Sequence, residues 1–79
     1  MKNYAVGYLT FFENELKMFK IQADSEYEAV KQAMVEAAGK EEYKQDEIDW
    51  QASEDYPGNL EDLIEMLYNS DVAVNVIEV

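Results

Sequence analysis

Carboxylates are the reactive groups that this sequence offers in quantity. The segment Glu41–Glu65 carries ten acidic side chains and one lysine, Lys44. The whole chain has 18 acids against six lysines and no arginine, for a net charge of −12. It contains no cysteine and no histidine, so the thiolate and imidazole groups that most often bind zinc or act as general bases are missing. Carboxylates are therefore the first groups to consider for any chemistry.

Two kinds of carboxylate chemistry fit the sequence poorly. A glycosidase holds an acid pair about 5–10 Å apart across a cleft, but 18 acids on 79 residues meet that distance by chance and leave little room for a cleft. An EF-hand loop needs oxygen ligands at positions 3 and 5 and glycine at position 6. Counted from Asp46, these positions hold Ile48, Trp50 and Gln51. We therefore predict a protein that is not an enzyme and has no metal site and no cofactor.

The negative charge is concentrated in one half of the chain. Residues 1–40 hold six acids and five lysines, a balance of −1, whereas residues 41–79 hold twelve acids and one lysine, a balance of −11. Phosphate backbones and anionic membranes attract Lys and Arg, so neither nucleic acid nor a membrane is an expected direct partner. A basic protein surface, of the kind that binds nucleic acid, is the expected one.

An acidic ridge is the candidate contact surface. In a strand, Glu47 and Asp49 would lie about 6.6–6.8 Å apart on one face, and in a helix Glu61 and Glu65 would lie one turn apart. Such a row would imitate successive phosphates of a nucleic-acid strand, and an aromatic side chain would supply the desolvated anchor. The predicted partner-binding residues are Glu47, Asp49, Trp50, Glu54, Asp55, Tyr56, Glu61, Asp62 and Glu65.

The overall profile, short, acidic, cysteine-free and mixed in its predicted elements, is similar to that of small phage-encoded proteins that inhibit host nucleic-acid enzymes, among them DNA mimics. The similarity is one of composition and involves no matched motif. It implies a non-enzymatic inhibitor that acts by stoichiometric protein binding.

The N-terminal region predicts a β-hairpin. Asn3–Phe12 is rich in β-branched and aromatic residues, and Leu16–Ala23 alternates between apolar and polar side chains. Gly7 within the first strand indicates a bulge or a close approach by another group. One face of that strand would carry Tyr4, Val6, Tyr8 and Phe12. We leave open whether this face is core or an exposed interface.

Capping residues predict the starts of two helices. Ser25 and Glu28 form a capping box before a helix over residues 26–38, and Gly39 ends it. After the turn at Tyr56-Pro57-Gly58, Asn59 and Asp62 form a looser box. That box begins a second helix, which ends near Tyr68 or Asn69. The expected buried side chains are Tyr27, Val30, Ala33, Met34, Ala37, Leu60, Leu63, Ile64 and Leu67.

Two further strands complete the prediction. Ile48, Trp50 and Ala52 alternate with polar residues, which favours a short strand over residues 46–52. Trp50 would then be buried, or an exposed anchor if this strand lies at the sheet edge. Val72–Val79 has apolar residues on both faces and is predicted to be the last strand.

The predicted fold is one acidic α+β domain over residues 1–79, in the order β-β-α-β-α-β. We expect a two-layer sandwich with two helices on one face of a four-stranded mixed or antiparallel sheet. No signal peptide and no apolar run of membrane-spanning length is visible, so we expect a cytoplasmic protein. The alternative to docking on a basic protein is a small assembly protein that forms homodimers through its last strand.

Overall fold

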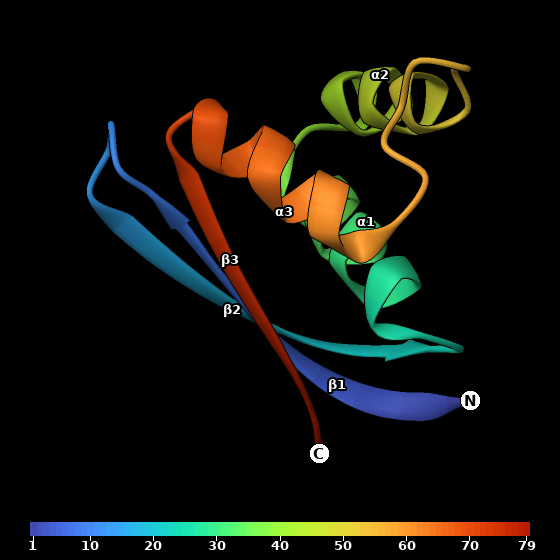
Figure 1. Cartoon of the computed structure of the whole chain (residues 1–79). Coiled ribbons are helices and arrows are strands. Elements are labelled where there is room, and N and C mark those ends of the chain that lie inside the picture. Colours follow the sequence, from blue (N-terminus) through green and yellow to red (C-terminus); the bar gives the residue numbers. More distant parts are fainter.

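The computed structural model describes all 79 residues, and it contains one antiparallel sheet covered on one face by helices (Figure 1). The strand order is β2-β1-β3, so β1 is central and the other two strands are edges. The elements in chain order are β1 (Lys2–Thr10), β2 (Glu15–Ala23), α1 (Glu26–Ala37), α2 (Glu41–Gln51), α3 (Leu60–Asn69) and β3 (Val72–Glu78).

The prediction of four strands and two helices is wrong, because the sheet has three strands and the chain has three helices. The prediction of a strand over residues 46–52 caused the error, since residues 46–51 belong to α2 and Ala52 is its C-cap. All strand pairs are antiparallel, so the sheet is not mixed and no parallel crossover exists. The coarser prediction of an α+β chain with helices on one face of a sheet is confirmed.

The composition of α2 explains why a helix forms where alternation suggested a strand. The segment EEYKQDEIDWQ is made mostly of Glu, Gln and Lys, which favour helix, and it has two acids in its first turn, where the helix dipole favours them. No residue of α2 is buried. The helix face with the least exposure carries Lys44, Glu47 and Gln51, so the apolar periodicity that normally reveals a helix is absent.

The predicted hairpin is confirmed, with a continuous register from Lys2 opposite Ala23 to Thr10 opposite Glu15. No bulge interrupts the register at Gly7. Of the two alternatives predicted for this glycine, the close approach is the one observed, and it is made by the Met18 side chain. The strand ends at Thr10, and the turn that follows contains Phe12, which is 94% exposed. Phe12 is therefore no part of the strand face on which it was predicted.

Both predicted helix starts are confirmed by hydrogen bonds. The Ser25 hydroxyl accepts from the Glu28 backbone N–H at 3.2 Å, and the Asn59 side-chain oxygen accepts from the Asp62 N–H at 2.9 Å. The Asn59 amide also donates to the Asp62 carboxylate at 2.9 Å. Gly39, with φ of 83°, follows α1 in the left-handed conformation that glycine favours.

The core lies between the sheet and the pair α1 and α3. Alternation along β1 points Tyr4 and Val6 toward the helices, where they are almost fully buried, and Tyr8 is partly buried on the same face. These residues are thus core and not interface. The α2 helix packs against α1 and is the helix farthest from the sheet (Figure 1). The buried residues are Tyr4, Val6, Ile21, Ala23, Ala29, Val30, Ala33, Met34, Tyr56, Leu63 and Leu67.

The last strand returns to pair with β1 after all three helices. Its register runs from Tyr4 opposite Glu78 to Thr10 opposite Val72, and the Val79 N–H donates to the Asn3 carbonyl at 2.9 Å. The two chain ends consequently lie at the same end of the molecule (Figure 1). The prediction of a final strand is confirmed, and β3 is an edge strand.

Candidate interaction surfaces

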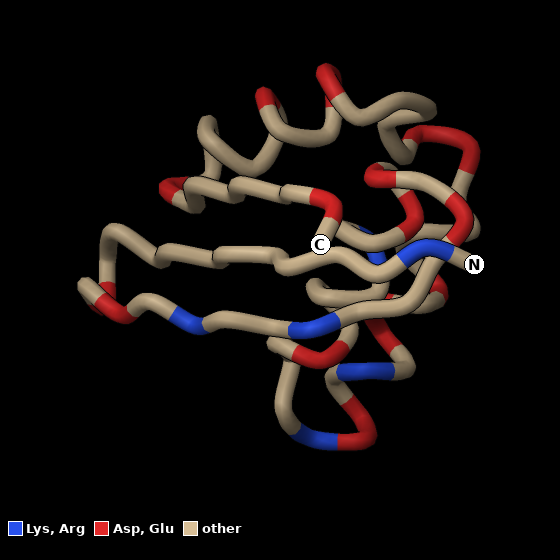
Figure 2. The backbone as a smooth tube through the Cα atoms, turned by 90° about the horizontal axis from the view of Figure 1, so that it is seen from below, with Lys and Arg blue, Asp and Glu red and all other residues tan.

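The acidic positions gather on the helices and their connections, whereas β1 and β2 hold one acid and three lysines (Figure 2). Of the predicted contact acids, Glu47 and Asp49 lie on α2, Glu54 and Asp55 on the segment after it, and the other three on α3. Six of these seven acids are exposed, and Glu47 is the exception.

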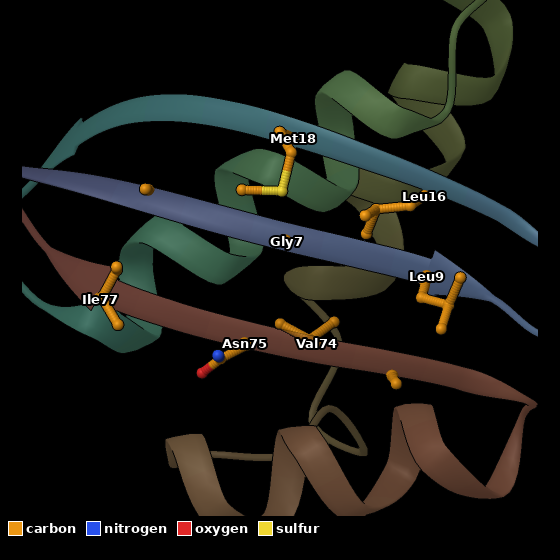
Figure 3. Close-up of a pocket in the computed structure, with 9 residues that line it drawn as sticks. Gly7, Leu9, Leu16, Met18, Val74, Asn75 and Ile77 are labelled. Carbon is orange, nitrogen blue, oxygen red and sulfur yellow. The ribbon is translucent and has the colours of Figure 1, made fainter.

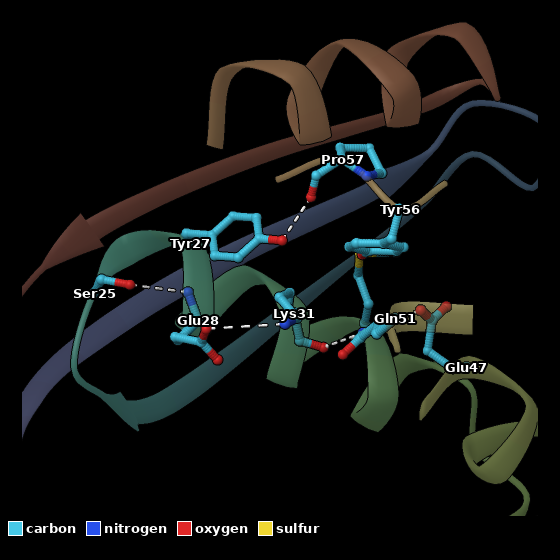
Figure 4. Close-up of polar contacts among 9 residues, drawn as sticks. Ser25, Tyr27, Glu28, Lys31, Glu47, Gln51, Tyr56 and Pro57 are labelled. Carbon is cyan, nitrogen blue, oxygen red and sulfur yellow. Dashed lines mark hydrogen bonds and ion pairs between the residues drawn. The ribbon is translucent and has the colours of Figure 1, made fainter. Parts of the chain in front are cut away.

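The helix separates Glu47 from Asp49, which the strand prediction placed side by side. Residues two apart on a helix do not face each other. Glu47 is partly buried and accepts from the Gln51 amide at 3.0 Å, and this amide also donates to the Lys31 carbonyl on α1 at 3.0 Å (Figure 4). Asp49 is exposed and accepts from Gln45 at 2.9 Å. The strand-spaced part of the acidic ridge is thus not formed.

Glu47 is the acid whose ionisation the fold perturbs. Burial raises the pKa of its carboxyl above the ordinary value of 4.5, and the hydrogen bond from Gln51 opposes this rise. Burial is also the main cause of the raised pKa of the Tyr56 hydroxyl, and the nearby Glu47 charge adds to it. Glu47 therefore belongs to the packing between α2, α1 and the segment that follows α2, and not to a free surface.

The two aromatic anchor candidates have different surroundings. Trp50 is 42% exposed and meets the Tyr56 ring edge to face, with ring centroids 5.7 Å apart. Tyr56 is only 8% exposed, and its hydroxyl lies 3.6 Å from the sulfur of Met34. Tyr56 is therefore part of the core, and Trp50 is the candidate that a partner can reach.

The acids of α3 form the more regular group. Glu61 and Glu65 lie one helical turn apart and are exposed, while Asp62 is exposed but holds the amide of Asn59. The α2 and α3 helices do not pack against each other. The candidate acids therefore form two groups, joined by the segment 52–59 that carries Glu54 and Asp55.

None of the seven candidate acids pairs with a lysine. The four ion pairs are Lys2 with Glu78, Lys17 with Glu15, Lys31 with Glu28, and Lys44 with Glu36, at 3.8–3.9 Å. The single lysine of the acidic half, Lys44, thus pairs with an acid of the other half. The negative charge of α3 and of the segment before it is left uncompensated by the monomer.

A second surface, which the sequence patterns did not reveal, is the face of the sheet without helices. It contains a shallow apolar hollow of about 340 Å³ along the central strand. Its side chains come from all three strands, because the alternation of β1 that directs Tyr4 and Val6 inward directs Ala5 and every second residue after it outward. The lining residues are Ala5, Gly7, Leu9, Leu16, Met18, Ala73, Val74, Asn75 and Ile77.

No group of three or more acids converges in a way that would hold a metal ion. The helices are also too short or too polar to cross a bilayer. A scan against protein-family models and searches of curated proteins and of solved structures find nothing that matches this chain.

Proposed function

We propose that this protein is a non-enzymatic binding module whose acidic helical side docks on a basic protein surface, of the kind that binds nucleic acid. The observation that carries the proposal is the set of exposed, unpaired carboxylates on α3 and on the segment before it. The contact group consists of Glu54, Asp55, Glu61, Asp62 and Glu65, whereas the exposed Asp49 and Trp50 belong to α2, which does not pack against α3.

The charge balance supports docking over simple solubility. A net charge of magnitude about 2–8 is enough to keep a small domain soluble, and this chain carries −12. Ordinary surfaces mix acids with lysines, which would reduce self-repulsion, but α3 has no lysine. A basic partner supplies the missing cations, so that complex formation relieves the repulsion.

The spacing of the carboxylates along α3 supports a nucleic-acid-binding protein as the partner. Glu61 and Glu65 repeat along a rigid helix, so a groove that receives a row of phosphates can receive them. The protein would then act as an inhibitor that competes with nucleic acid, as in the phage-like mimics to which its profile is similar. Such a role places it in the cytoplasm together with the partner.

The test is capture from a lysate of the source cells at low salt, followed by elution with a short DNA duplex and, separately, with a salt gradient. We expect basic nucleic-acid-binding proteins to be captured and to be released by the duplex. Binding should weaken as the Debye length falls from about 10 Å at 0.1 M salt to about 3 Å at 1 M.

A pair of charge-matched variants separates the site from the net charge. The test variant is Glu54→Gln, Asp55→Asn, Glu61→Gln and Glu65→Gln, and it should lose the captured proteins. The control variant removes four acids elsewhere and should retain them. Both have a net charge of −12 + 4 = −8. Equal capture by the two variants, or captured proteins that the duplex does not release, would contradict the proposal. The control substitutions are Glu13→Gln, Glu15→Gln, Asp24→Asn and Asp71→Asn.

A further inference from the structure

The open face of the sheet has the composition of a protein interface and not that of the rest of the surface. Leu16, Met18 and Ile77 are each more than half exposed. The register places them on either side of Ala5, Gly7 and Leu9 of the central strand. Contiguous exposed apolar surface of this kind marks an interaction site.

Side chains of β2 and β3 line the two sides of the hollow, and the central strand β1 lies between them (Figure 3). Gly7 forms the floor, and the side chain of Met18 bends over it, so that a Cβ built at Gly7 would lie 3.3 Å from the Met18 sulfur. On the β3 side, Asn75 and Ile77 line the hollow. A surface with both a ridge and a groove is complementary to a second, rotated copy of itself, as a twofold interface requires.

The charge on this face also points to a second copy. Among the side chains that alternation directs to this side of the three strands, Lys20 is the one charged group, and none of the 18 acids is present. Two molecules of net charge −12 repel each other at any acidic surface. The open face is where they can approach with their carboxylates turned away from the contact.

We infer that a second copy of this chain covers the open face, with the two sheets packed face to face. Packed sheets lie about 10 Å apart with strands aligned within about 30° or crossed near 90°. The Met18 side chain of each copy, which covers its own Gly7, packs against the open face of the other copy. This contact differs from pairing of edge strands, since both edges of each sheet stay unpaired.

The size of the face suits a dimer of modest affinity. The nine residues of β1 span about 30 Å, and three strands about 4.8 Å apart give a width of about 14 Å with side chains. The footprint is therefore about 400 Å² in projection, and the relief of the side chains raises the accessible area above that. Stable interfaces bury about 600–1,000 Å² per partner, and the face lies below that range, so we expect a weak dimer.

The experiment is sedimentation velocity of the full chain from about 10 μM to 1 mM. We expect the mass to rise from 9.2 kDa toward 18.4 kDa, which is twice 9.2 kDa. Salt screens the repulsion between two acidic copies, so raising salt should leave the dimer unchanged or strengthen it. This is the reverse of the salt response expected for docking on a basic partner, and no partner is present in the assay. The two proposals therefore fail separately.

Two substitutions with equal charge test the location of the contact. Met18→Glu adds one negative charge at a residue that is 64% exposed on the open face, and it should raise the dissociation constant at least tenfold. Tyr68→Glu adds the same charge at a residue that is 63% exposed on α3, and it should change the constant less than threefold. A monomer throughout the concentration range, or an equal effect of both variants, overturns the inference.

A thiol probe gives a second readout that leaves the core intact. The native chain has no cysteine, so Asn75→Cys places a single thiol on the open face and Ser70→Cys places one after α3. Maleimide should label Asn75→Cys at least fivefold more slowly at 1 mM than at 10 μM protein, with Ser70→Cys unchanged. Labelling of Asn75→Cys that does not depend on protein concentration excludes the face-to-face dimer.

Discussion

Tyr27→Phe tests whether one hydrogen bond holds the connection between α2 and α3 in place. The Tyr27 hydroxyl on α1 donates to the Pro57 carbonyl at 2.6 Å in a partly buried position (Figure 4). Phenylalanine keeps the ring, and with it the Lys31 ammonium 5.0 Å from the ring centre, but leaves the carbonyl without its donor. The variant therefore isolates the hydrogen bond.

The expected cost follows from the burial of that carbonyl. An unsatisfied buried acceptor costs about 1–3 kcal/mol, and because this one is only partly buried we expect about 1–2 kcal/mol. A domain of 79 residues has a total unfolding free energy of about 4–12 kcal/mol. At about 4–8 °C per kcal/mol for a domain of this size, the melting temperature should fall by about 4–16 °C.

Urea unfolding and thermal melting followed by circular dichroism measure the effect. Tyr43→Phe is the matched control, because Tyr43 is exposed on α2 and its hydroxyl makes no hydrogen bond. It should change the unfolding free energy by less than about 0.5 kcal/mol. Equal changes in the unfolding free energy of the two variants would show that the Tyr27 hydrogen bond does not stabilise the fold.

Three further predictions follow from other features of the fold. Glu47→Gln should be more stable than the wild type at pH 7, because burial raises the pKa of Glu47 and so penalises its charged form; the difference should shrink as the pH falls through the raised pKa and disappear below the ordinary value of 4.5, where the carboxyl is protonated in both the folded and the unfolded chain. Urea melts at several pH values measure this, and a constant difference would contradict it. In hydrogen exchange, the α2 amides should exchange faster than those of α1 and α3, since α2 buries no residue; equal protection would show that its polar contacts suffice. Gly7→Ala should stabilise the monomer by about 0.4–1 kcal/mol, because alanine lowers the conformational entropy of the unfolded chain and the flexible, exposed Met18 side chain can move away from the new Cβ. Urea melts should detect this gain, whereas a loss of stability would mean that Met18 is held in place.

The parts of the fold that were predicted correctly are those whose causes are local. Ser25 and Asn59 cap their helices through atoms three residues away, so the neighbouring sequence contains both partners of each bond. The hairpin likewise joins strands close in the chain, and its alternation matches the buried face. Such signals do not depend on the rest of the molecule.

The prediction failed at α2, where the helix faces its neighbour with polar side chains. Gln51 bonds to the Lys31 carbonyl, and Lys44 lies 3.8 Å from the Glu36 carboxylate. These contacts leave no apolar period in the sequence, so the accidental alternation of Ile48, Trp50 and Ala52 was the strongest pattern available. The helix-favouring composition of the segment, and not this alternation, determines the structure that forms.

Composition alone established the excess of acids, the concentration of negative charge after residue 40 and the absence of thiols and imidazoles. Only the tertiary structure decided that Glu47 turns inward while Glu61 and Glu65 stay exposed, that Tyr56 is core, and that one face of the sheet is left without helices. The physical reason is that a sheet has two faces, and in this fold α1 and α3 pack on one of them while α2 packs on α1. Which residues remain in water then depends on contacts between segments far apart in the chain, and a linear pattern does not contain these contacts.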